Sequence, residues 1–596
     1  MTDGDKPKEQ PEPGKGGQEP EEKDRTLPEF PAPQADEVTE AAPPIERRAA
    51  TRTTARPIDR SKGAALLVGT GILLSRLAGL IRQTMMARYL GADFAADAFN
   101  AAFRIPNMLQ NLFGEGVLSA SFIPEYSGHL GRRDEKEANR LAGAVAGMLA
   151  LIASIIVLLG VVAAPWLVAV IANGFTGEKR ELTVQLTRIL FPGAGLLVFS
   201  AWCLGILNSH RRFFMSYTAP VIWNAAMIAT LIFFHSGHTQ AELAIYLAVG
   251  SVVGSALQFA IQLPLVLKLA RGVRPRLDIA GESIRRVFRN FVPAFVGRGV
   301  VQISAYVDAW LASYLGNGAV SSFTYAQAIY VLPISLFGMA ISAAELPAMS
   351  RAVGTTAEIG AYLRGRLSDG LDRIAYFVVP SAVALFALGD LIVLLLFQSG
   401  RFHRGNTIWV WQILMGSSVG LLASTMGRLY SSTFYAMRDT RTPLRYAIVR
   451  VVLTTGLGYL FALVLPPMLG LDRKLGAVGL TASAGLAGWV EFYLLRRQLD
   501  KQIGRTRLVP SRMARLWGAA IVGGMIPWAY KLWVDRGAAP IFSAHVTAVH
   551  SKLMALVLLA LFGLTYLAMT AAFGIPEARN VIDRGKRLIK LVLRTG

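Results

Sequence analysis

The sequence has few charges, one cysteine and no clustered metal ligands, and each shortage excludes a class of protein. Only 17% of its 596 residues are charged, against about 25% in soluble domains, so an ordinary cytoplasmic globule is excluded. The single cysteine, Cys203, excludes a disulfide framework and a cysteine-based metal site. None of the seven histidines lies beside Cys, Asp or Glu at metal-ligand spacing.

Motifs for nucleotide and acyl chemistry are also missing from the sequence. It has no phosphate-binding GxxxxGK[ST] loop, no kinase signature and no GxSxG nucleophile turn. We therefore expect a protein that is not an enzyme and holds no cofactor. An ATP-driven pump would need a partner that supplies the ATPase.

Long apolar runs dominate what is present. Hydrophobic residues make up 53% of the chain, and its mean hydropathy is +0.43. Windows of about 18 or more apolar residues indicate helices that cross a bilayer. They predict an all-α polytopic membrane protein with about fourteen spans, near 64–90, 97–126, 142–172, 183–208, 217–234, 243–267, 291–315, 319–349, 374–397, 407–436, 446–466, 475–495, 516–534 and 551–574.

The connections between these spans alternate in charge. Every second connection is basic, and these six hold 28 Lys and Arg, whereas the seven others hold 7. Basic connections stay in the cytoplasm, so both termini are predicted to be cytoplasmic. The net charge of +22 is thereby assigned to membrane topology and not to nucleic acid. The basic segment 584–594 is typical of an amphipathic helix lying on anionic lipid.

Composition and a faint repeat divide the chain into regions. Residues 1–60 hold ten prolines and many charges, which predicts a disordered cytoplasmic tail. Segment 87–106 resembles segment 312–333, and each runs from one span through a short outer loop into the next. Two such halves predict two lobes, at 61–270 and 271–500, with substrate between them. Two more spans at 501–575 and a basic cytoplasmic tail at 576–596 complete the arrangement.

Polar residues within the spans are candidates for function, because charge inside a membrane is costly. The second span carries a stripe at spacings of three and four, which keeps it on one helix face: Asp97, Asn100, Arg104, Asn107, Asn111 and Glu115. Such a stripe either forms a buried polar helix interface or lines a hydrated central cavity.

Arginines in the first two spans favour an anionic substrate. Arg76, Arg82 and Arg104 lie at depths from which they could reach one group, with Arg298 of the seventh span as a further candidate. Guanidinium groups bind phosphate or pyrophosphate through paired, charge-assisted hydrogen bonds, whereas hydrophobic cationic drugs would require carboxylates. Glu115 would hold an arginine in place or help to close a cytoplasmic gate. Asp308 binds a cation or pairs with an arginine.

Three segments resemble a known family. SRLAGLIRQTMMARYLGADFAADAFNAAFRIPNMLQNLFGEGVLSASFIPEY (75–126) is similar to the first hairpin of the MurJ/MviN family, the lipid II flippases of peptidoglycan synthesis. LFQSGRF (396–402) and FYAMRDTRTPLR (434–445) resemble later connections of that family. The likeness covers about residues 62–575.

The resemblance implies the fold of the multidrug/oligosaccharidyl-lipid/polysaccharide (MATE-like, MOP) superfamily, with two lobes that alternate between inward-open and outward-open states. It implies a bacterial cytoplasmic (inner) membrane protein for cell-wall biogenesis that flips lipid II, undecaprenyl-pyrophosphate disaccharide-pentapeptide. Its partners would be lipid II, membrane lipids and cell-wall synthesis proteins. Substrate positions carry over onto Ser75, Arg76, Arg82, Asp97, Arg104, Asn107 and Glu115, and Asp308 matches a position associated with sodium.

The sequence departs from the family pattern at four positions. Gln83 and Gln110 stand where many members have an acidic residue and an arginine, and Gln327 and Ala328 replace a segment that carries an arginine. Either Arg298 replaces that arginine, or the chain flips another polyprenyl-pyrophosphate glycan. The sequence is also compatible with a MATE-like exporter or a non-transporting membrane scaffold. Coupling to sodium or to the membrane potential is left open.

Overall fold

The computed structural model describes residues 60–595 except 114, 279–280, 507–508 and 537–547. The tail predicted at 1–60 lies outside the described residues except for Arg60, at which the first helix begins. Within the described part every regular element is helical and there is no strand, as predicted. This agrees with the chain's low charge and long apolar runs, since helices satisfy their own backbone hydrogen bonds in lipid.

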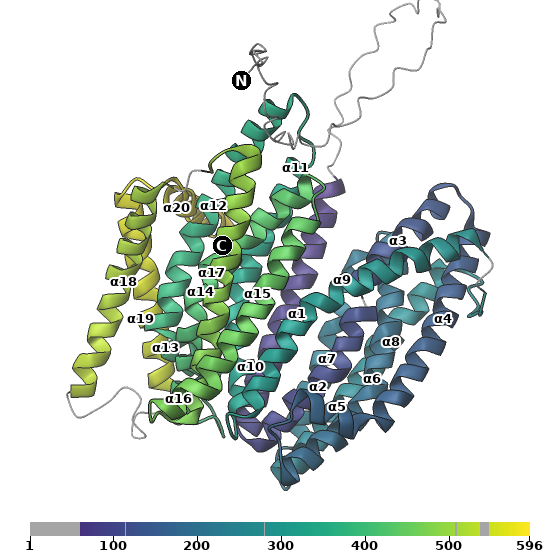
Figure 1. The fold of residues 1–596 in the computed structure, drawn as a ribbon, viewed down its shortest axis with the longest axis horizontal. Helices are drawn as coiled ribbons and strands as arrows, with labels where there is room; N and C mark the ends of the chain where they lie inside the picture. Colours follow the sequence, from purple (N-terminus) through teal and green to yellow (C-terminus); the bar gives the residue numbers. More distant parts are fainter. Residues whose placement is uncertain (1–59, 114, 279–280, 507–508, 537–547, 596) are drawn as a thin grey trace, which may run out of the picture. The chain divides into compact units, whose positions relative to one another are not determined.

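The first eight helices pack mainly on one another and form what we call the N-terminal bundle (Figure 1). The central helix is α6, which contacts α2, α3, α4, α5 and α8. The bounds are α1 (Arg60–Leu90), α2 (Phe94–Phe113), α3 (Glu115–Gly131), α4 (Glu135–Val162), α5 (Ala164–Ile171), α6 (Gly177–Ser209), α7 (Phe213–Phe234) and α8 (Gln240–Leu269).

The next helices form the C-terminal bundle, in which α14 and α17 make the most extensive contact. A Cβ added to Gly420 of α14 would meet Gly485 of α17 at 2.4 Å, so small residues allow this approach. The bounds are α9 (Glu282–Ser313), α10 (Ala319–Pro333), η1 (Ile334–Met339), α11 (Ala340–Met349), α12 (Thr356–Ala387), α13 (Gly389–Leu396), α14 (Arg404–Ala436), α15 (Arg441–Tyr459), η2 (Leu460–Val464), α16 (Leu465–Met468), η3 (Arg473–Leu475) and α17 (Gly476–Ile503).

Three further helices follow the C-terminal bundle: α18 (Pro510–Arg536), α19 (Ala548–Ala572) and α20 (Pro576–Thr595). Helix α18 packs on α12, and α19 packs on α13 and α18. Arg512 of α18 ties them to the bundle, since its guanidinium lies 3.0 Å from Asp372 of α12 and 2.6 Å from Glu577 of α20.

The order of elements recurs in the two bundles. In each, a long helix (α4 or α12) is followed by an eight-residue helix (α5 or α13) and then by the long central helix (α6 or α14). Local sequence fixes several starts. Asp134 accepts a hydrogen bond from the Glu137 amide at the start of α4, and Thr355 and Glu358 form a capping box at the start of α12.

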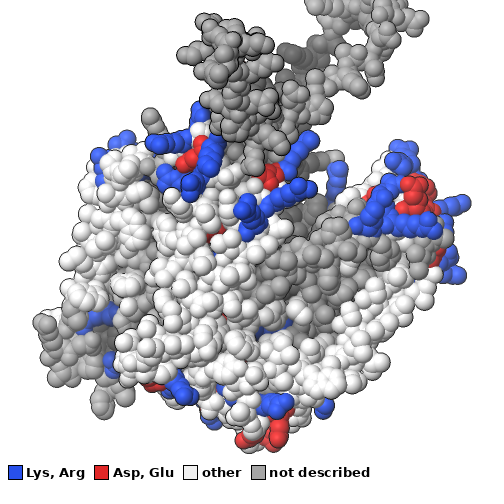
Figure 2. Space-filling view, in the orientation of Figure 1, with Lys and Arg blue, Asp and Glu red and all other residues white. Residues whose placement is uncertain are grey.

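Charges are sparse in the middle of the face shown in Figure 2. On the face shown in Figure 2, Lys, Arg, Asp and Glu gather mainly toward two opposite ends, with a broad band of other residues between them. Ten described helical segments are long and apolar enough to cross a membrane. The chain is therefore a multi-pass membrane protein. The other predicted spans coincide with α1, α2–α3, α9 and α18, so the count of fourteen stays a prediction.

Helix α9 joins the two bundles. Near Ser283 it packs against α3, where the hydroxyl lies 3.0 Å from Nε2 of His129, and farther along it packs against α15. The contacts that position a site between the bundles include those of α2 with α10. There the turn between α1 and α2 faces the turn between α9 and α10.

Candidate functional site

Asp97 is the most enclosed carboxylate at the junction of the bundles. It lies in the first turn of α2, and none of its surface is exposed. A buried carboxylate is stable only when several donors replace the water that it has lost. The donors around Asp97 therefore decide what this residue does.

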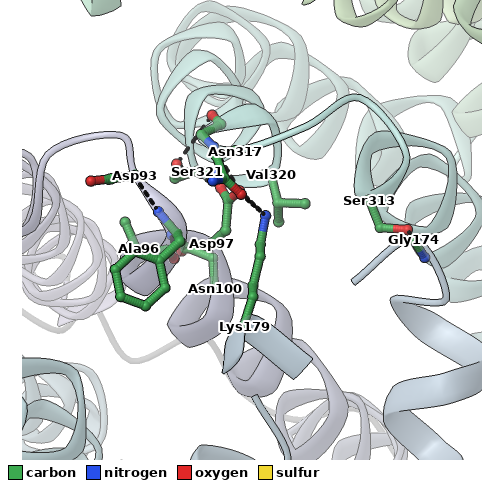
Figure 3. A network of polar contacts seen from close by, with 12 residues as sticks. Asp93, Ala96, Asp97, Asn100, Gly174, Lys179, Ser313, Asn317, Val320 and Ser321 are labelled. Carbon is green, nitrogen blue, oxygen red and sulfur yellow. Dashed lines mark hydrogen bonds and ion pairs between the residues drawn. The ribbon is translucent and has the colours of Figure 1, made fainter. Parts of the chain in front are cut away.

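Four donors surround Asp97, and three of them come from the other bundle (Figure 3). The amide of Gly318 donates to Oδ2 at 2.7 Å, and the amide and hydroxyl of Ser321 donate to Oδ1 at 2.7 and 2.8 Å. Nζ of Lys179 in α6 donates to Oδ2 at 2.6 Å. Asp97 thus caps the start of α10 from the opposite bundle, where backbone amides lack partners and a negative charge is favoured.

Other hydrogen bonds between the bundles surround this cap. Tyr325 of α10 donates to the carbonyl of Gly91 at 2.9 Å, and the amide of Arg401 donates to the carbonyl of Arg88 at 2.9 Å. The amide of Gly174 donates to the Ser313 hydroxyl at 3.0 Å. We call the central network the latch, formed by Asp97, Lys179, Asn317, Gly318 and Ser321.

Glycine is required at the closest approach in the latch. Gly318 has a φ of +85°, and a Cβ there would lie 2.4 Å from the carbonyl oxygen of Ala92. Only glycine adopts that backbone conformation at no steric cost and leaves room for the opposing carbonyl. The latch is therefore built for close contact between the two turns.

A polar pocket of about 470 Å³ opens beside the latch. Lys179 and Asn317 line it, together with Tyr314 and Thr176. Asp97 lies deeper, because its side chain is fully buried whereas that of Lys179 is 10% exposed. Water in this pocket would reach the lysine before it reached the carboxylate.

Arg82 on α1 is partly buried among apolar groups. Its guanidinium carbon lies 4.7 Å from the ring of Trp223 and 6.0 Å from that of Phe103, and Nη1 lies 3.8 Å from the sulfur of Met227. Its Nε is buried and has no hydrogen-bond partner. No ion pair with a described carboxylate compensates this cation, which is the arrangement expected of an anion site.

Arg104 on α2 reaches the other bundle. Its Nη2 donates to the Thr324 hydroxyl at 3.5 Å, and its guanidinium lies 5.7 Å from the Phe323 ring. Tyr306 of α9 donates to the Arg104 carbonyl at 3.0 Å. The Arg82 guanidinium lies near the ring of Phe103, the residue that precedes Arg104 in α2. The structure therefore brings these two predicted arginines to one region.

Asp308 lies on α9 within the electrostatic reach of two arginines, Arg104 and Arg450. Arg450 is itself paired with Glu491 at 3.1 Å. One carboxylate oxygen of Asp308, Oδ1, is buried and accepts no hydrogen bond. The described residues contain no group of three His, Cys, Asp or Glu that could hold a metal ion.

The remaining predicted residues are spread more widely. Ser75 is partly exposed and Arg76 is exposed on α1. Six residues separate Arg76 from Arg82, about 9 Å along the helix, so Arg76 lies nearer the other end of the molecule. Asn107 of α2 is half-buried beside α6. Glu115 and Arg298 lie on α3 and α9, but their side chains fall outside the described residues, as do those of Asn111 and Gln110.

The structure places the first residues of the polar stripe in a buried helix interface. Asp97 and Asn100 are buried in helix contacts, and Nδ2 of Asn100 donates to the carbonyl of Ala96 at 2.8 Å. Arg104 and Asn107 are partly exposed. The start of the stripe is therefore a polar helix interface, and a wall of a hydrated cavity is left only for the later residues.

Lys179 is a functional residue that the sequence pattern does not single out, because it lies in one of the weakly basic connections. The available signal was its position just before the apolar fourth span, in a set of connections with few basic residues. A partner for Asp97 could not be found from spacing, because Lys179 is 82 residues away in the chain.

Comparison with known proteins assigns the family. The model of the lipid II flippase MurJ family matches residues 86–545, which is most of the chain. The chain belongs to the MurJ lipid II flippase family. It is 31% identical over 477 residues to the lipid II flippase MurJ of Burkholderia cenocepacia, covering 78% of this chain and 89% of that protein. It is 32% identical over 537 residues to a probable lipid II flippase MurJ of Rhizobium meliloti, covering 87% and 95%.

Solved structures agree with this MurJ-family assignment at the level of fold. A lipid II flippase MurJ in an inward closed conformation matches with a TM-score of 0.70 and 22% identity, over 87% of this chain and 100% of that one. An inward-facing MATE transporter of the MOP superfamily matches with a TM-score of 0.60 and 18% identity, over 74% and 98%. The predicted fold class is thereby confirmed.

Proposed function

We propose that this chain flips lipid II from the cytoplasmic to the periplasmic leaflet of the bacterial inner membrane by alternating access. Membership of the lipid II flippase family supports the substrate. The basic connections support an orientation with both termini in the cytoplasm, which places the latch at the periplasmic end. The latch then closes the periplasmic side in the state described above.

The observation that carries the proposal is the uncompensated cation at Arg82. A pyrophosphate that enters the protein leaves water, and fixed guanidinium groups offset that loss with paired hydrogen bonds. Arg82 has aromatic rings and a thioether around it but no described carboxylate, so its charge is available to a ligand. Arg104 lies in the same region and donates a hydrogen bond to the Thr324 hydroxyl of the other bundle.

The decisive experiment combines complementation of cells depleted of their own lipid II flippase with a direct measurement of lipid II translocation. Arg82→Ala should lower translocation about 100-fold, the equivalent of two charge-assisted hydrogen bonds. Arg82→Lys should lower it about tenfold, because lysine keeps the charge but loses the planar fork. Arg88→Ala is the matched control, since Arg88 is exposed on the same helix.

Normal translocation by Arg82→Ala at normal expression would remove the anion site from this mechanism. Failure of the wild-type chain to complement would instead argue against lipid II. In that case the second candidate, a flippase for another polyprenyl-pyrophosphate glycan, should be tested with those substrates. Gln83, with an unpartnered buried oxygen, and Gln327 are the departures that favour it.

Coupling to sodium or to the membrane potential is proposed through Asp308. Its unpartnered buried oxygen could accept a cation, while the charges of Arg104 and Arg450 oppose one. If Asp308 binds the driving ion, Asp308→Asn should remove most of the dependence of translocation on external sodium, measured at fixed membrane potential. An unchanged sodium response, with normal amounts of protein in the membrane, would assign Asp308 to an internal ion pair.

A further inference from the structure

Lys179 is buried at a place where a lysine is unfavourable. It lies in the first turn of α6, and the positive end of the helix dipole disfavours a cation there. Its neighbours Glu178, Arg180 and Glu181 are exposed, whereas only 9% of Lys179 is accessible. The ammonium lies 4.0 Å from the ring of Phe175, so the side chain is packed and not merely covered. A compensating interaction must hold it in this position.

The bonds of Asp97 divide into two kinds. The bonds to Gly318 and Ser321 join the two bundles and must break when the bundles separate. The bond to Lys179 lies within the N-terminal bundle, because α2 and α6 pack closely together. It can therefore persist in both states, but its contribution to the free energy differs between them.

We propose that Lys179 is the positioning residue that sets how tightly the latch closes, an inference that rests on the proposed transport cycle. In the closed state Asp97 is fully buried, and the attraction between the two charges is strong in a medium of low dielectric constant. When the latch opens, water enters from the adjoining pocket and the same pair contributes little. The pair thus stabilises the closed state more than the open one.

The charge of Lys179 also orients Asp97. With the ammonium on Oδ2, the carboxylate presents Oδ1 to both donors of Ser321 and shares Oδ2 with the amide of Gly318. Lys179 adds a direct contact with the other bundle through Oδ1 of Asn317 at 3.3 Å. Without the lysine, closing the latch would bury a carboxylate whose charge has no counter-ion.

Hydrogen–deuterium exchange of the full chain in lipid nanodiscs tests this without added substrate. The amides of Gly318 and Ser321 donate to Asp97, so peptides that cover 316–324 report latch opening. Lys179→Met should raise exchange there about tenfold, and Lys179→Gln should behave similarly, because glutamine can donate a hydrogen bond but carries no charge. Lys179→Arg should restore most of the protection.

Two control variants separate the latch from general damage. Arg180→Gln removes an exposed charge from the same turn and should leave exchange unchanged. Lys531→Met breaks another buried lysine–aspartate pair and should lower thermal stability without exposing 316–324. A double-mutant cycle with Asp97→Asn should show that removing Lys179 changes exchange less than twofold once the carboxylate is gone.

Unchanged exchange in Lys179→Met, or full protection in Lys179→Gln, would overturn the inference. Because exchange is measured without lipid II, this outcome is separate from the test of transport. A chain that fails to flip lipid II but shows the expected exchange pattern would retain the latch and lose the proposed substrate. A chain that flips lipid II but shows unchanged exchange in Lys179→Met would retain the proposed substrate. In that case the pair of Lys179 and Asp97 would have a structural role only.

Discussion

Two buried lysine–aspartate pairs in this molecule have the same length but different surroundings. Lys179–Asp97 and Lys531–Asp390 each join Nζ to Oδ2 at 2.6 Å, and each ammonium lies against an aromatic ring. Both oxygens of Asp97 also accept bonds from the opposite bundle. Oδ1 of Asp390, by contrast, is buried without a hydrogen-bond partner.

The difference shows that an ion pair does not reveal its role by its own geometry. Lys531 lies in α18 and Asp390 in α13, so their pair fastens a peripheral helix to the C-terminal bundle. We therefore expect it to affect stability in every state. The pair of Lys179 and Asp97 lies where two bundles meet, and its neighbours must change when they separate.

Asp97→Ala should have the largest effect on transport. It removes the cap of α10 and leaves Lys179 buried without a counter-ion, so the latch should not close. We expect lipid II translocation to fall at least about 100-fold, since several charge-assisted bonds are lost. Asp93→Asn is the control, because Asp93 is exposed in the adjoining turn and asparagine can still cap α2. Near-normal translocation by Asp97→Ala would show that the latch is dispensable.

Ser321→Ala should have an intermediate effect. It deletes one donor to Asp97 but keeps the Ser321 amide, so the cap is weakened and not lost. A charge-assisted hydrogen bond of about 1.5 kcal/mol corresponds to roughly a tenfold change in the ratio of closed to open latch. Hydrogen exchange at 316–324 measures that ratio. A change as large as that of Asp97→Ala would mean that the hydroxyl, not the charge, dominates the latch.

Lys531→Met should affect transport least and stability most. It leaves Asp390 buried and unpaired, which typically costs roughly 3–5 kcal/mol. The midpoint of thermal unfolding in detergent should fall, while translocation per folded molecule stays within about twofold. Changing Asp390 to Leu in the same chain should recover stability, because apolar packing can replace a buried pair. Lost transport at unchanged stability would place this pair in the transport cycle too.

Much of the fold follows from local pattern. The apolar windows coincide with helices because a membrane span must satisfy its own backbone hydrogen bonds. The predicted third span begins at 142, whereas α4 begins at Glu135, about two helical turns earlier, where Asp134 caps it.

The site was predictable only in part. Arg82 and Asp97 stood out as costly charges in apolar spans, and both lie at positions with specific contacts. Their roles did not follow from the pattern: Asp97 was placed among the substrate residues, yet its carboxylate is fully occupied by protein donors. Ser321 carries no signal of its own in the sequence, and the only signal of Lys179 is its position in a connection with few basic residues.

Composition and the spacing of apolar and charged residues determined that this chain is a helical membrane protein. They also determined which charged residues lie within apolar spans, where charge is costly. These properties are set by the transfer of each segment into lipid, which depends on local sequence alone. Only the tertiary structure decided which charges meet. Asp97, Lys179 and Ser321 are brought together across 82 to 224 residues by helix packing, and the low dielectric constant of that contact gives their charges a role in closing the protein.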